Sequence, residues 1–299
     1  MIRLQAMRNL QMVERIERAP VEYPLRFAFA GDSGAYSDPT ADAIFSQLVH
    51  QVTWCDPLFF VNLGDFAGPG TLERHLSYLR LVEPLGAPNI CVVGNHDLEE
   101  DGGREVWARV HGPMNFEFGH GHTRFVAIHA ASRPGRLDRR EPSTAVVGPQ
   151  AEDLEFLEAA LSGAREPNRV VLMHMPPYLN GWFAPHEEWG FGHMEREFLE
   201  IVRSNRVKLV CCAHGLAFDT YVHDGIRFVM SGGGGTGLCS HKRGVCVEGK
   251  GRPEDRGALF HFVEVSLGQN GSIGGRVVQA FADRDTFRFT FGDGSNARD

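Results

Sequence analysis

Short apolar runs recur along the chain, and segments with helical spacing of apolar residues separate them. The runs lie in LRFAFAGD (25–32), PLFFVNLGD (57–65), NICVVGNHD (89–97), RVVLMHMPP (169–177) and VKLVCCAH (207–214). Each run is almost continuously apolar, which is typical of a strand that is buried on both faces. Helical patterns cover residues 40–52, 71–81, 150–161 and 193–204. This alternation of strands and helices predicts an α/β fold.

The other segments carry the pattern of antiparallel strands. Residues 115–131 are typical of a hairpin that turns at 119–121, and further strands are expected at 226–230, 258–265, 275–281 and 286–291. Residues 2–18 have helical spacing that ends before Pro20 and Pro24. We therefore expect two mixed sheets rather than one parallel sheet. The expected domain covers residues 25–292, with an N-terminal helix or arm in 1–24 and a tail in 293–299.

Polar side chains of metal-binding types stand at the ends of the five apolar runs. They are Asp32, Asp65, Asn95, His174 and His214. In open α/β sheets, ligands bind outside the carboxyl ends of the strands. Any one of these side chains would be unremarkable as a surface or capping group, but charged groups avoid five successive strand ends unless they have partners. Oxygen and imidazole ligands together suit Mn, Fe or Zn, so the pattern predicts a divalent metal site.

Composition and charge narrow the class of protein. The chain has 299 residues, with 30 basic and 38 acidic side chains and a formal net charge of −8, which argues against nucleic acid as the main partner. The apolar runs are too short to span a membrane, and the charged N-terminus does not have the pattern of a secretory signal. We expect a cytoplasmic protein, and the sequence does not indicate its oligomeric state.

The strand-end motifs resemble those of the calcineurin-like metallophosphoesterases, a superfamily that includes purple acid phosphatases and cyclic-nucleotide phosphodiesterases. The matching motifs are GDSG (31–34), GDFAG (64–68), GNHD (94–97), MHMPPY (173–178) and AHGL (213–216). The GGGG run at 232–235 is similar to that of the purple acid phosphatase branch. The resemblance covers residues 26–291 and implies a four-layer α/β/β/α sandwich, a centre for one or two divalent metal ions, and phosphoester hydrolysis. It also implies that the substrate is a phosphorylated small molecule.

The chain departs from the family pattern around one of the two metals. The family's first motif is usually Asp-x-His and its last is usually Gly-His-x-His, but Gly34 and Leu216 stand at the two histidine positions. Purple acid phosphatases supply a tyrosine where this chain has Gly68. The first metal position therefore keeps Asp32 and the shared Asp65 alone. Its replacement ligands could come from nearby residues, namely Tyr36, Asp219 and His223.

The second metal position keeps the full ligand set that the family implies: Asp65, Asn95, His174 and His214. We expect a mononuclear or asymmetric site where metal-bound hydroxide attacks phosphorus of a monoester or diester. His96 is the expected general acid for the leaving alkoxide, and Asp97 is expected to orient or charge-stabilise its imidazole. The alternative is a degenerate relative that binds metal or a phosphorylated ligand without efficient turnover.

An aromatic-rich segment at 182–191 follows the fourth motif. Two interpretations stay open for it, a lid that faces the substrate and a small satellite core.

Overall fold

The computed structural model describes residues 8–131, 148–177, 191, 194–238, 259–281 and 285–291. The helices are α1 (Arg8–Arg18), α2 (Pro39–Cys55), α3 (Leu72–Leu81), α4 (Gly103–Val110), α5 (Ala151–Ser162) and α6 (Glu195–Ser204), with 3-10 turns η1 (Glu83–Leu85) and η2 (His96–Leu98). The strands are β1 (Leu25–Ala30), β2 (Phe59–Asn62), β3 (Asn89–Cys91), β4 (Phe116–His120), β5 (Thr123–Ala127), β6 (Asn168–Leu172), β7 (Leu209–Cys212), β8 (Phe218–His223), β9 (Ile226–Ser231), β10 (His261–Leu267), β11 (Ile273–Gln279) and β12 (Asp285–Phe291). None of the described helices is long and apolar enough to cross a membrane.

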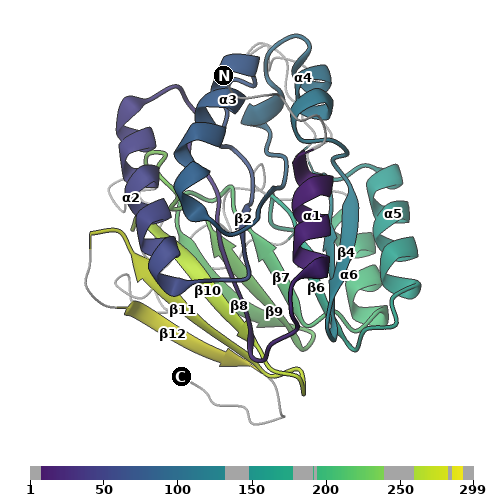
Figure 1. Cartoon of the computed structure of the whole chain (residues 1–299). Helices are drawn as coiled ribbons and strands as arrows, with labels where there is room; N and C mark the ends of the chain where they lie inside the picture. Colours follow the sequence, from purple (N-terminus) through teal and green to yellow (C-terminus); the bar gives the residue numbers. More distant parts are fainter. Residues whose placement is uncertain are drawn as a thin grey trace, which may run out of the picture.

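Within the described residues, the strands form two six-stranded sheets (Figure 1). The first has the order β12-β11-β10-β1-β2-β3, and the second has the order β4-β5-β6-β7-β9-β8. β1, β2 and β3 run parallel, while β10 to β12 continue the first sheet in antiparallel fashion. In the second sheet β5, β6, β7 and β9 run parallel between the antiparallel strands β4 and β8. The prediction of two mixed sheets is therefore confirmed.

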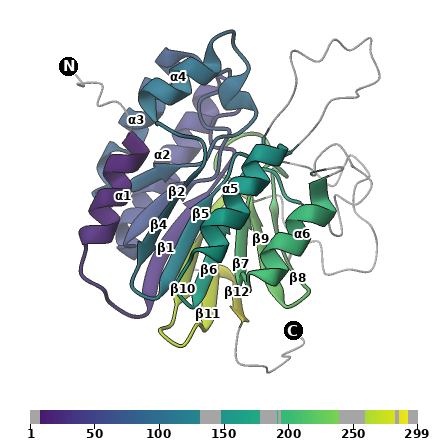
Figure 2. The same cartoon turned by 90° about the vertical axis from the view of Figure 1, so that its right-hand side faces the viewer.

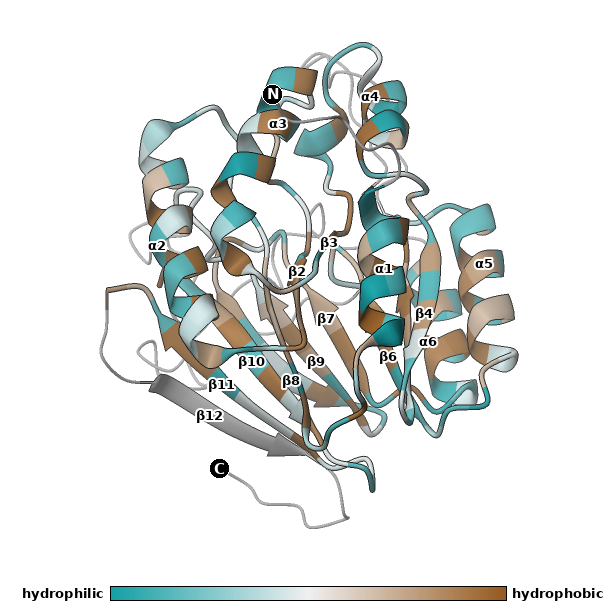
Figure 3. Cartoon of the chain, viewed as in Figure 1, coloured by the Kyte–Doolittle hydropathy of each residue, from teal (hydrophilic) through white to brown (hydrophobic). Residues whose placement is uncertain are grey.

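Three apolar cores lie between four layers. The largest core fills the space between the two sheets, and the other two lie between each sheet and its helices. α2 packs on the first sheet together with α3, and α5 and α6 pack on the second, in front of β6 and β7 in Figure 2. Apolar residues accordingly concentrate on the strands and on the helix faces turned toward them (Figure 3). This is the four-layer α/β/β/α sandwich that the motifs implied.

β1 explains why the strand sequences are continuously apolar. Phe27 and Phe29 point into the core between the sheets, whereas Ala28 and Ala30 face the helices of the first sheet. All four side chains are fully buried. A strand that is covered on both faces has no position for a polar side chain until it ends, so polar residues collect at its end.

Most of the predicted elements are confirmed, and the differences have local causes. The four predicted helices and the hairpin are present, and the strands predicted at 258–265 and 275–281 begin three residues later and two residues earlier than expected. The prediction missed β8, because its polar residues Asp219, Thr220 and His223 interrupt an apolar pattern, and it missed the short helix α4. Residues 182–190 lie outside the described residues, while Phe191 is buried against Phe198 in the outer core of the second sheet.

The N-terminal helix α1 closes one open side of the sandwich. It contacts β3 and β4, the neighbouring edge strands of the two sheets, and Met12, Val13 and Ile16 extend the core between the sheets. The boundary at residue 24 stays a prediction, but this helix packs on the sandwich rather than standing apart from it. Asn9 also pairs with the edge of β3, because its Nδ2 donates to the Cys91 carbonyl (2.8 Å) and its Oδ1 accepts from the Cys91 N–H (2.9 Å).

Replacing Asn9 with alanine should destabilise the fold, because two buried backbone groups of Cys91 lose their partners. We expect Asn9→Ala to lower the free energy of unfolding by about 1–3 kcal/mol in chemical denaturation. Leu10→Ala, on the neighbouring and 41% exposed position of the same helix, is the control and should change stability by less than about 0.5 kcal/mol. Equal stabilities of the Asn9→Ala variant and the unsubstituted protein would show that α1 does not seal this edge.

Candidate metal centre

The five predicted strand-end residues come together where the two sheets meet. Asp32, Asp65 and Asn95 follow β1, β2 and β3 of the first sheet, and His174 and His214 follow β6 and β7 of the second. All five are buried. Since parallel strands present their carboxyl ends at one edge, the topology alone brings residues that are up to 182 positions apart into contact, as in the hydrogen bond from His214 to Asp32.

The backbone is strained at three of these residues. Asp32, Asp65 and His214 have left-handed φ angles of 58°, 57° and 67°. This region is uncommon for residues other than glycine and is tolerated best by Asn, Asp and His. Such angles are held only where the surrounding structure fixes them, and they are characteristic of functional sites. Here they turn the chain sharply at the strand ends, so that the side chains face one another.

The core of the centre is an Asp65–His174–His214 cluster. Nε2 of His174 lies 3.2 Å from Oδ2 of Asp65 and 3.2 Å from Nδ1 of His214. Within the described residues, this is the one group of three or more acidic, histidine or cysteine side chains whose ligand atoms all lie within 4.8 Å of one another. Nδ1 of His174 lies 2.7 Å from the Leu63 carbonyl, which can only accept, so that nitrogen carries the hydrogen and Nε2 faces the cluster.

Protons balance the buried charges of the cluster. Burial raises the pKa of Asp32 to about 8. Burial would also raise the pKa of Asp65, but the charge of His174 and its hydrogen bond hold that pKa below its usual range. In turn, Asp65 raises the pKa of His174 to about 9, although burial opposes this. Protons therefore supply the positive charge that the buried carboxylates require, and a divalent cation would supply it instead.

Asn95 gives an independent test of whether these residues fit a metal. Its side chain is 5% exposed, and within the described residues neither Oδ1 nor Nδ2 has a hydrogen-bond partner. A buried amide that is left unpaired costs about 1–3 kcal/mol, so a native structure rarely keeps one without a reason. Coordination of a cation by Oδ1 would account for it. The residues at the second metal position therefore fit a divalent ion.

Asp97 has a different place from the one predicted. Its Oδ1 accepts hydrogen bonds from the backbone N–H groups of Phe66 and Ala67, and its Oδ2 accepts from those of Asp65 and Gly94. The side chain is fully buried. These four bonds tie the loop after β2 to the loop after β3. The structure thus makes Asp97 a support for the two metal-binding loops rather than the partner of the His96 imidazole.

The carboxylate beside His96 belongs to Glu99, which the sequence analysis missed. Nδ1 of His96 lies 2.7 Å from Oε1 of Glu99, at the distance of an ion pair. The other ring nitrogen, Nε2, lies 3.9 Å from Oδ2 of Asp65 and so faces the metal cluster. The available signal was the spacing of three residues from His96, the first residue of η2, to Glu99, which directly follows this 3-10 turn, because residues three apart eclipse in such a turn.

Among the described residues, no third acidic, histidine or cysteine side chain forms a close cluster with Asp32 and Asp65 at the first metal position. Asp32 accepts a hydrogen bond from the His214 N–H at 2.8 Å, and Leu216 has no donor atom to offer. Asp219 and His223 do not join a three-residue cluster among the described residues. His223 pairs with Ile226 at one end of β8, and Phe218 pairs with Ser231 at the other end, which is the end nearer the metal centre. His223 therefore lies at the end of β8 that is farther from the metal centre. Tyr36 lies against the His96 ring, with ring centroids 4.9 Å apart.

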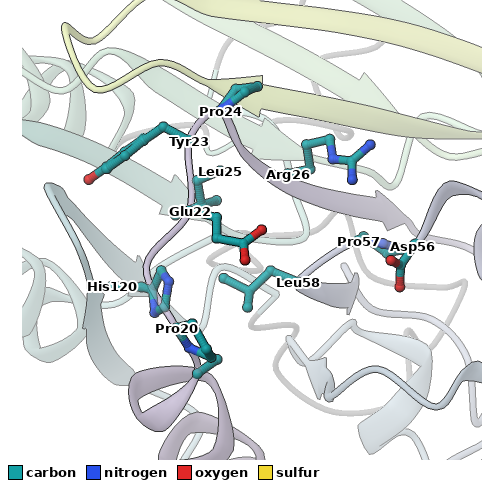
Figure 4. Close-up of a pocket in the computed structure, with 11 residues that line it drawn as sticks. Pro20, Glu22, Tyr23, Pro24, Leu25, Arg26, Asp56, Pro57, Leu58 and His120 are labelled. Carbon is teal, nitrogen blue, oxygen red and sulfur yellow. The ribbon is translucent and has the colours of Figure 1, made fainter.

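A separate cavity of about 400 Å³ lies away from the residues of the candidate metal centre (Figure 4). Glu22, Arg26, Asp56 and His120 contribute its polar lining. The cavity is at the end of the sandwich where β1 and β2 begin and β4 ends, so it faces away from the metal-binding residues.

Comparison with known proteins finds a family whose sequence model matches this chain. A model of the calcineurin-like phosphoesterase family matches residues 25–217. No curated protein matches the chain by sequence. The family match ends before β8, but β8 to β12 complete both sheets, and β10 pairs directly with the central strand β1.

Solved structures share the fold at low sequence identity. The purple acid phosphatase PPD1 from yellow lupin seeds has a TM-score of 0.65 and 18% identity over 92% of this chain, which spans 54% of that protein. GAP50, described as the anchor in the inner membrane complex of Plasmodium, has a TM-score of 0.65 and 16% identity, with 89% of this chain and 88% of that one covered. A dimetal phosphatase from Danio rerio has a TM-score of 0.64 and 13% identity, with 90% and 99% covered.

The substitution Asn95→Ala tests whether Asn95 is a metal ligand or a structural residue. Because the amide has no hydrogen-bond partner among the described residues, its removal should leave the metal-free protein as stable as before, or more stable. The variant should bind Mn²⁺ at least about 100-fold more weakly. Calorimetric titration and thermal unfolding with and without Mn²⁺ measure both effects, since saturating metal at 100 times Kd adds about 2.7 kcal/mol to stability.

Asn62→Ala is the matched control for this measurement. Asn62 is also fully buried, but its amide is satisfied, because Nδ2 donates to Ser33 Oγ and Oδ1 accepts from the Gly64 N–H. This variant should lose stability even without metal. A loss of metal-free stability in Asn95→Ala, with unchanged Mn²⁺ affinity, would contradict the role of Asn95 as a ligand.

Proposed function

The chain belongs to the calcineurin-like phosphoesterase family, and from that premise we propose that it is a metal-dependent hydrolase of phosphomonoesters or phosphodiesters. The observation that carries the proposal is the buried set of Asp65, Asn95, His174 and His214 with His96 beside it. The unpaired amide of Asn95 supports a cation at this place, and a cation would replace the proton that now balances Asp65 and His174. Mn, Fe and Zn suit this mixture of oxygen and imidazole ligands.

Each residue of the centre has a defined part in this proposal. A divalent ion bound here supplies Lewis acidity, which activates water and polarises a phosphoryl oxygen. Asp65, Asn95, His174 and His214 would hold it, with His174 oriented by its bond to the Leu63 carbonyl. His96, whose Nε2 faces the cluster, gives a proton to the leaving oxygen as the ester bond breaks.

Backbone packing at two of the family's ligand positions, Gly34 and Gly68, supports an asymmetric or mononuclear centre. A Cβ atom at Gly34 would lie 2.6 Å from the Phe66 carbonyl oxygen, and a Cβ atom at Gly68 would lie 1.9 Å from the Ala35 carbonyl oxygen. The two loops are joined by hydrogen bonds from the Gly34 N–H to the Asp65 carbonyl and from the Gly68 N–H to the Gly34 carbonyl, each 2.9 Å long. The side chains that the family uses as ligands have no room at these positions.

The same backbone packing favours a second candidate function. In this alternative, the protein binds metal or a phosphorylated ligand without efficient turnover. GAP50, which shares the fold, is described as an anchor rather than as an enzyme. The placement of His96 against the cluster supports the enzyme instead, because a binding protein has no need of a proton donor at that point.

Hydrolysis assays test the proposed function directly. We expect the purified protein with Mn²⁺, Fe²⁺ or Zn²⁺ to cleave p-nitrophenyl phosphate or bis(p-nitrophenyl) phosphate, and to lose this activity with a chelator. His96→Ala should lower kcat for esters of basic alcohols by roughly 100-fold or more, because it removes the proton donor. His50→Ala, at an exposed position on α2, is the control and should retain full activity. An absence of hydrolysis with all three metals, despite measured metal binding, would favour the binding protein.

A further inference from the structure

The cavity at the other end of the sandwich has walls that hydrogen bonds hold in place. It has a volume of about 400 Å³ and lies between the linker after α1 and the starts of β1 and β2 (Figure 4). The hydroxyl of Tyr23 in this linker accepts a hydrogen bond from the His122 N–H at 2.8 Å, which ties the linker to the β4–β5 hairpin. The Leu58 N–H donates to the Arg26 carbonyl at 2.8 Å, which joins the approach to β2 with β1. The cavity is therefore a preformed space, and its volume is in the range of small-molecule sites.

His120 brings an unpaired polar atom to this space. The residue ends β4 and lines the cavity, although only 3% of its surface is exposed. Within the described residues, its Nδ1 has no hydrogen-bond partner. Leu25, Pro57 and Leu58 contribute apolar surface to the same lining. Native proteins rarely bury a polar atom without a partner, so this nitrogen is suited to a polar group of a bound molecule.

Three charged side chains line the cavity at exposed positions: Glu22, Arg26 and Asp56. In the part of the chain that the structure describes, no hydrogen bond or ion pair holds any of these three side chains. Figure 4 shows Arg26 and Asp56 on one side of the space, His120 on the other, and Glu22 between them. A guanidinium beside two carboxylates complements a ligand that carries both a negative and a positive charge.

We propose that this cavity binds a free α-amino acid whose apolar side chain ends in a hydroxyl group, as the side chain of tyrosine does. The carboxylate of the amino acid pairs with Arg26, and its ammonium group pairs with Glu22 and Asp56. Its side chain extends along the apolar lining to His120. Binding is non-covalent, and the inference does not depend on the proposed hydrolytic function.

The unpaired nitrogen of His120 is the reason for the hydroxyl group. A phenol both donates and accepts hydrogen bonds, so it can pair with Nδ1 whichever ring nitrogen carries the hydrogen. The apolar lining favours an aromatic ring between this hydroxyl and the charged end of the ligand. Phenylalanine has the same ring and the same charges but leaves Nδ1 unpaired. The site should therefore discriminate between the two amino acids.

Calorimetric titration of the whole chain tests this proposal with four probes. We expect L-tyrosine to bind at one site per chain and L-phenylalanine to bind roughly 10-fold more weakly or worse. Tyramine lacks the carboxylate and 3-(4-hydroxyphenyl)propionate lacks the ammonium group, so each should bind about 3- to 10-fold more weakly than L-tyrosine. Mn²⁺ with inorganic phosphate should not displace L-tyrosine, because the candidate metal centre lies at the other ends of β1 and β2.

Substitutions assign the individual contacts. Arg26→Gln should weaken binding of L-tyrosine by about 3- to 10-fold and leave binding of tyramine within about twofold, because tyramine has no carboxylate to lose a partner. His120→Leu should remove the preference for tyrosine over phenylalanine. Arg80→Gln, at an exposed position on α3, is the matched control and should bind L-tyrosine as the unsubstituted protein does.

The comparison of ligands keeps the test decisive even where a variant does not fold. Equal affinities of the unsubstituted protein for L-tyrosine and L-phenylalanine would overturn the inference. No binding of L-tyrosine up to its solubility limit would also overturn it. Displacement of L-tyrosine by phosphate with Mn²⁺ would place the amino acid at the metal centre and would contradict a site at this cavity.

Discussion

The geometry of the centre depends on the buried carboxylate of Asp97, which holds the backbone of two loops in place. Asp97 accepts four backbone hydrogen bonds, three of them from residues 65–67 and one from Gly94. Burial, together with the neighbouring charge of Asp65, raises the pKa of Asp97 to about 6 against the effect of these bonds. The backbone N–H of His96 in turn donates to Oδ1 of Asp65. These reciprocal contacts fix the loops after β2 and β3, and the bond from His174 to the Leu63 carbonyl joins the second sheet to them.

Close packing also joins the loops after β1 and β2, and this packing supports the proposed asymmetry of the centre. Hydrogen bonds from Gly34 and Gly68 bring the loops after β1 and β2 together where additional ligands would project, and Thr236 fastens the first of these loops through bonds to Ala35 and Asp32. Leu216 keeps a left-handed φ of 50° although it offers no ligand atom. Among the described residues, the side chains that could bind a metal gather around His174.

The sequence predicted the architecture and the composition of the centre because both follow from patterns along single strands. Continuous apolar runs indicated strands covered on both faces, and their polar ends indicated Asp32, Asp65, Asn95, His174 and His214. The side-chain contacts of His96 and Asp97 could not be predicted from such patterns. They depend on the directions in which side chains point in and directly after one short 3-10 turn. Asp97 was expected beside the His96 imidazole, but Glu99, two positions later, lies there instead. The fit of α1 across two sheet edges likewise depends on Asn9 meeting Cys91, which lies 82 residues away.

Crystals of the protein grown with Mn²⁺ give the most direct test of this account. Anomalous diffraction should reveal one strong peak per chain, within bonding distance of Asp65, Asn95, His174 and His214. Density at the first metal position, near Asp32 and Gly34, should be absent or weak. Two fully occupied peaks would contradict the asymmetric centre, and no peak at the four residues would contradict the metal site itself.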